Sequence, residues 1–164
     1  MATFTTSLTG SNITPLTFNE VTNDFSVRYN IPYTAINIAT STATGDVVTL
    51  NLGTTPTNWI VPGAYGWVAT GFTAASLTGL SVTVGTTTNV ACFLASTQVS
   101  GAVTGNIIQA TNGINTTNVA ASSTGTAAVT TVAQFTITGA AGFNSLTAGN
   151  IQLYMQYKDL TGTY

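Results

Sequence analysis

The chain has 164 residues, of which only 4% are charged (2 Lys and Arg, 4 Asp and Glu, no His), where about 25% is usual. Proton-transfer catalysis normally uses His or converging carboxylates, and nucleic-acid binding requires a basic patch, so this composition argues against an enzyme and against a nucleic-acid partner. No apolar run reaches the ~18 residues of a spanning helix, so no membrane association is expected either.

The first segment, residues 1–15, is polar and lacks a strong core pattern. We predict that it forms an N-terminal arm that reaches a neighbouring subunit. Residues 16–164 have the length of one domain and are predicted to fold together. With so little charge, the surface of this domain is expected to be coated by neutral side chains and covered in part by other subunits.

Alternation between apolar and polar residues marks the predicted strands, because such a pattern is typical of a strand with one face in a core. The clearest segments, in chain order, are 25–31, 48–52, 80–84, 133–138 and 151–158. Weaker candidates are 4–8, 36–40, 59–61, 65–70, 90–95 and 106–110, and turn signals stand at 44–46, 62–63, 78–79, 112–113 and 148–150. We therefore predict an all-β protein, an antiparallel β-sandwich or jelly-roll-like single domain.

One long segment interrupts this pattern. Residues 111–128 (TNGINTTNVAASSTGTAA) contain few large apolar residues and many small polar ones. Because strongly patterned strands follow it, the segment is predicted to be a long exposed loop within the domain.

The few groups that could carry chemistry are dispersed along the chain. The four acids, Glu20, Asp24, Asp46 and Asp159, are interpreted as solvated, capping or ion-paired residues. Cys92 is the single cysteine, and its surroundings (VACFL) favour a small buried apolar residue. One cysteine with dispersed acids does not complete a zinc site, so neither a metal nor another cofactor is predicted.

The C-terminal run 146–160 (LTAGNIQLYMQYKDL) resembles the C-terminus of tailed-bacteriophage head decoration, or cement, proteins. A looser resemblance extends to residues 59–64 (WIVPGA) and 80–86 (LSVTVGT). The resemblance implies a β-sandwich that forms a homotrimer on the outer surface of the virion and bridges neighbouring major capsid proteins. The surface that docks on the capsid does not follow from it.

Five aromatic residues are the candidates for a subunit interface: Phe4, Trp59, Trp67, Tyr154 and Tyr157. Large aromatic side chains dominate the energetics of cores and interfaces, and Trp59 and Trp67 are predicted to pack in one or the other. Two alternatives stay open. A tail-fibre, baseplate or head-fibre component would share the low charge, and in a carbohydrate-binding adhesin module Trp59, Tyr65 and Trp67 would form an aromatic platform.

Overall fold

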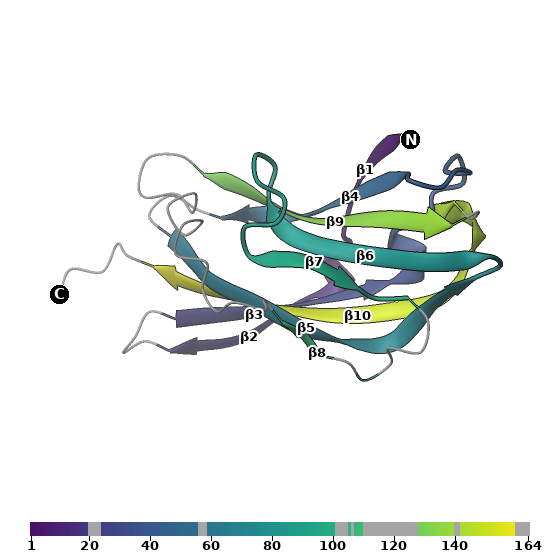
Figure 1. Ribbon diagram of the computed structural model, residues 1–164. Coiled ribbons are helices and arrows are strands. Elements are labelled where there is room, and N and C mark those ends of the chain that lie inside the picture. The colour runs from purple at the N-terminus through teal and green to yellow at the C-terminus, as the bar shows by residue number, and fades with distance from the viewer. Residues whose placement is uncertain are drawn as a thin grey trace.

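Two five-stranded sheets face each other in the computed structural model (Figure 1). The structure describes residues 1–19, 24–55, 59–100, 105, 107–109, 128–139 and 142–159; for 17–19, 24, 25, 59, 60, 62, 63, 107–109 and 159 it describes the backbone only. The strands are β1 (Thr3–Ser7), β2 (Ile13–Asn19), β3 (Asp24–Pro32), β4 (Val47–Thr55), β5 (Trp59–Ala74), β6 (Leu77–Thr86), β7 (Leu94–Gln98), β8 (Ile107–Gln109), β9 (Val129–Gly139) and β10 (Leu146–Asp159). Three short 3-10 helices accompany them: η1 (Gly10–Asn12), η2 (Tyr33–Ala35) and η3 (Phe143–Ser145).

The strand orders confirm the predicted all-β sandwich. Sheet A, the upper layer in Figure 1, has the order β1-β4-β9-β6-β7, and sheet B, the lower layer, has the order β2-β3-β10-β5-β8. Strands β1 and β4 pair in parallel, and the remaining strand pairs are antiparallel. The jelly-roll-like connectivity stays a prediction.

Side-chain alternation places the core between the two sheets, as the sequence pattern predicted. Along β10, Ile151, Leu153 and Met155 are fully buried, while the alternate residue Gln156 is exposed. The opposite sheet contributes its own inward row, and the rings of Phe72 in β5 and Phe135 in β9 meet with their centroids 6.3 Å apart. The large apolar residues of both sheets thus form one core.

Three of the predicted turns are wrong, because strands run through them. Residues 62–63 lie inside β5, 78–79 inside β6 and 148–150 inside β10, each at or near a register shift. Gly149 has φ +141°, and a side chain there would collide with the ring of Phe72. A glycine in a strand therefore marks a bulge or a close approach here, and not a chain reversal.

Two of the weaker strand predictions also need correction. Residues 36–40 do not form a strand; they follow η2 in a turn region, where the amide of Ile36 bonds back to the carbonyl of Tyr33 at 3.0 Å. In the segment 90–95 the strand β7 begins only at Leu94. Of the predicted loop 111–128, residues 111–127 lie outside the described residues, and Ala128 is exposed immediately before β9.

The predicted N-terminal arm is integrated into both sheets of its own chain. Strand β1 is the edge of sheet A beside β4, and β2 is the edge of sheet B beside β3. Leu8, between them, is 8% exposed and belongs to the core. The polar segment TFTTS lacks a core pattern because an edge strand can be held by its backbone hydrogen bonds. Contact of this segment with a neighbouring subunit stays a prediction.

Candidate functional site

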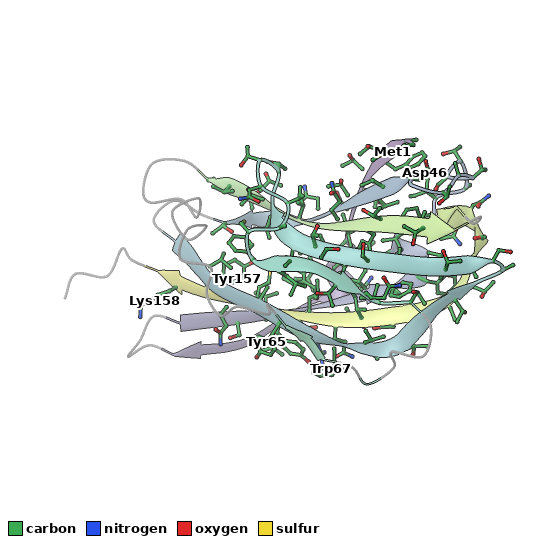
Figure 2. The ribbon with its side chains drawn as sticks, viewed as in Figure 1. Met1, Asp46, Tyr65, Trp67, Tyr157 and Lys158 are labelled. Carbon is green, nitrogen blue, oxygen red and sulfur yellow. The ribbon has the colours of Figure 1, made fainter. Side chains whose placement is uncertain are left out.

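An aromatic cluster of Tyr65, Trp67 and Tyr154 lies on the outer face of sheet B. Tyr65 and Trp67 are two residues apart on β5 and therefore point to the same side, while Tyr154 comes from the neighbouring β10. Figure 2 shows Tyr65 and Trp67 on the side of sheet B that faces away from sheet A. The cluster is thus on the molecular surface and outside the core.

The three rings stack on one another. The centroids of Tyr65 and Tyr154 are 5.4 Å apart with an interplanar angle of 11°, and those of Trp67 and Tyr154 are 5.2 Å apart with an angle of 29°. Tyr65 remains 44% exposed and Trp67 39% exposed. Offset stacking at these distances is favourable by roughly 0.5–1.5 kcal/mol per pair, so the rings hold one another in place without being removed from solvent.

Local backbone geometry brings the rings together. Tyr154 is directly opposite Tyr65, and Gln152 is opposite Trp67. Gly66, between the two aromatic residues of β5, allows the close approach, because a Cβ there would collide with the carbonyl oxygen of Gln152. The sequence alone placed these residues on strands but not in register, so it did not predict that residues 65 and 154 meet.

Polar side chains continue the same face across β10 and β3. The register places Arg28 beside Tyr154 and Asn30 beside Gln152. The Tyr154 hydroxyl donates to Oε1 of Gln152 at 3.2 Å, which leaves the Gln152 amide nitrogen as a donor. Arg28 donates from one Nη to Oγ1 of Thr14 at 3.5 Å, and among the described residues its Nε has no partner. This face therefore combines stacked rings with amide and guanidinium donors.

Tyr157 is not on the surface, and its assignment to a subunit interface is wrong. It is 7% exposed and its hydroxyl is 2.9 Å from that of Tyr29, which is 4% exposed. Figure 2 shows it between the two sheets. Residue 157 has the same parity as Ile151, Leu153 and Met155, so the alternation of β10 turns it inward. Burial raises the pKa of both tyrosines, and the Tyr29 hydroxyl raises that of Tyr157 further.

The other two interface candidates divide differently. Phe4 in β1 is partly buried and packs against the core. Trp59 begins β5, but its side chain lies outside the described residues, so its predicted role stays a prediction. Of the five candidates, the structure therefore brings Trp67 and Tyr154 together on one face, and it adds Tyr65.

Asp46 is a buried carboxylate that the sequence did not distinguish from the other acids. It is 3% exposed and accepts hydrogen bonds from the amide of Ala2 at 2.7 Å, the hydroxyl of Ser41 at 2.9 Å and the amide of Ala43 at 3.3 Å. The bond from Ala2 is the largest cause that lowers the pKa of Asp46; the bonds from Ser41 and Ala43 and the amino-terminal charge act in the same direction, against desolvation. This carboxylate fixes the start of β1 to the loop before β4 (Figure 2).

The remaining sites offer packing more than chemistry. Cys92 is 6% exposed, which confirms its interpretation as a buried residue, and burial raises the pKa of its thiol. Within the described part of the chain, no three His, Cys, Asp or Glu side chains gather where they could hold a metal ion. The same residues include no helix whose length and apolar character would let it span a bilayer.

Comparisons with protein-family models, with curated proteins and with solved structures found no match. The class of the molecule is therefore defined by its architecture, a two-sheet antiparallel β-sandwich with one parallel edge pair.

Proposed function

We propose that this protein is a structural subunit that decorates the outside of a tailed-bacteriophage head and stabilises the contacts between major capsid proteins. The observation that carries the proposal is the scarcity of charge. Six formally charged side chains share a surface of 7900 Å², about one per 1,300 Å², and Asp46 is buried. Near-neutral surface of this kind is typical of obligate contacts, whose cores are depleted in charged residues.

The edges of sheet A support a role in assembly. Strands β1 (TFTTS) and β7 (LASTQ) end this sheet on its two sides, and neither contains a charged residue or a proline. Monomeric β proteins commonly protect such edges with Lys, Pro or bulges, because unpaired backbone groups can add a strand from another chain. Edges with neutral side chains are suited to pairing with a neighbouring subunit.

The assignment to a phage head rests on the resemblance of residues 146–160. Most of this run forms β10, which lies in the middle of sheet B between β3 and β5. Its inward residues build the core, and its outward residues Gln152, Tyr154 and Gln156 belong to the outer face. The run therefore supports a shared sandwich fold, while the docking surface is specific to this chain.

Two measurements test this function. The first is the light-scattering mass of the purified protein, which we expect to correspond to a trimer. The second is co-sedimentation with heads of the corresponding phage that lack this protein, where we expect binding and a higher temperature of head disruption. A monomer that stays in the supernatant would contradict the proposal.

A further inference from the structure

We infer that the outer face of sheet B is a binding site for a neutral carbohydrate, with the aromatic cluster as the platform on which a sugar ring stacks. The inference is independent of the proposed decoration function, because it concerns a different face from the edges of sheet A. It rests on the area, the chemistry and the rigidity of the described residues on this face.

The exposed area of the cluster fits a small ligand. A large aromatic side chain presents roughly 150–250 Å², so exposures of 44% for Tyr65 and 39% for Trp67 leave on the order of 150–200 Å² of ring surface. A stable protein partner buries about 800 Å² on each side. The platform is therefore about a quarter of what a second copy of this chain would need, and comparable with one or two sugar rings.

The chemistry around the rings matches hydroxyl groups. One face of a pyranose ring carries C–H bonds, which pack on the electron-rich face of an aromatic ring, and its rim carries hydroxyls that need hydrogen-bond partners. Gln152 and Asn30 form one row beside Trp67, and Arg28 stands beside Tyr154 in the next. The Gln152 amide nitrogen and the Arg28 guanidinium supply donors, and the Asn30 side-chain oxygen supplies an acceptor, since its nitrogen already donates to Asn12 at 3.3 Å.

The platform is held rigidly before any ligand arrives. Its residues stand on β5 and β10 in the interior of sheet B, and β8 pairs with β5 directly opposite Tyr65 and Trp67. Behind them Leu153 and Val68 are fully buried in the core. Side chains on packed strands lose little freedom on binding, so an ordered aromatic platform can bind a ligand of modest area.

Affinity electrophoresis in native gels tests the inference with defined probes: dextran, mannan, galactan, laminarin and hydroxyethylcellulose, each cast in the gel. We expect at least one of these neutral polysaccharides to retard the protein. Trp67→Ala and Tyr65→Ala should each weaken that retardation at least tenfold, because each removes half of the exposed ring surface. Leu16→Ala is the matched control, since Leu16 is 41% exposed on the edge strand β2 of the same sheet.

Three results would overturn the site. They are no retardation by any of the five polysaccharides, retardation that survives both aromatic substitutions, and equal loss in the Leu16→Ala control. Light-scattering mass of the same variants identifies the competing occupant. If Trp67→Ala lowers the oligomer mass and no polysaccharide retards the unchanged protein, the face is a protein interface. Circular dichroism of each variant verifies that the sandwich is intact.

Discussion

Tyr29 and Tyr157 place two hydroxyl groups inside an otherwise apolar core. Their oxygens are 2.9 Å apart, and the hydroxyl of Tyr157 also interacts with Thr131 of sheet A, whose own hydroxyl is 3.2 Å from that of Thr55. A chain of hydroxyls therefore runs from sheet B to sheet A. Because buried polar groups are stable only when they are paired, this chain fixes how the two sheets align at this end of the sandwich.

Replacing Tyr157 with Phe should lower the free energy of unfolding by about 1–2 kcal/mol, because the Tyr29 hydroxyl loses its partner in a buried place. The midpoint of urea unfolding measures this change. Removing both hydroxyls, as Tyr29→Phe with Tyr157→Phe, should destabilise by less than the sum of the single changes. The exposed-face substitution Tyr154→Phe is the control and should shift stability by no more than about 0.5 kcal/mol. Equal effects at residues 154 and 157 would contradict the role of the buried pair.

At this scale the sequence predicted the direction of side chains better than their partners. The alternation of β10 correctly turned Leu153 inward and Gln156 outward. It also turned Tyr157 inward, so the interface assignment of that residue conflicted with the pattern of its own strand. Contacts such as Tyr65 on Tyr154 depend on the register between strands that are far apart in the chain, and no local pattern encodes that register.

Among the elements, β1 depends on a single ionisable anchor. The strand contacts its sheet on one side only, through β4, and its start is held by the bond between Ala2 and Asp46. The carboxylate is more stable in the folded protein than in the unfolded chain, because its pKa is lowered by hydrogen bonds that folding creates. The attachment of β1 is therefore coupled to pH.

The sign of this coupling gives a prediction. A carboxyl group with a lowered folded pKa contributes stability that is present above its unfolded pKa of about 3.9 and is lost as the pH falls through the folded value. Compared with Asp46→Asn, the unchanged protein should gain stability as the pH rises through about 4 and keep that gain to neutrality. Urea unfolding of both proteins between pH 3 and pH 7 (roughly the range of carboxylate titration) measures the difference. A difference that does not vary with pH would contradict the role of Asp46.

Element boundaries were less predictable than element type. Pro62, Gly63 and Gly149 are residues that usually end strands, yet β5 and β10 continue through them by means of register shifts. Strand β1 was missed as part of the sandwich for the opposite reason, since its polar residues carry no core pattern. In both cases the outcome was decided by a neighbouring strand, which propensity does not include.

For the whole molecule, the neutral edge of sheet A is where assembly can be blocked without harming the fold. Thr5 is exposed on β1, and a lysine there would place an unpaired charge at the edge of the sheet. We expect Thr5→Lys to abolish oligomer formation in light scattering and to change the free energy of unfolding by less than about 0.5 kcal/mol. Thr40→Lys, at an exposed position outside the strands, adds the same charge and should leave the oligomer intact. An unchanged mass for Thr5→Lys would exclude this edge as the contact.

The central positions of β9 and β10 have a consequence for how the chain matures. Each lies in the middle of its sheet, yet both come from the part of the chain after residue 128. A ribosome-bound chain that stops before this point holds two half-sheets with nothing to join them. Closure then requires partners more than a hundred residues apart, as for Tyr157 and Phe25, and such non-local pairing is slow. The apolar faces of β3, β4, β5 and β6 meanwhile stay open to other nascent chains, so synthesis in the cell is the step at which this neutral protein is most exposed to aggregation.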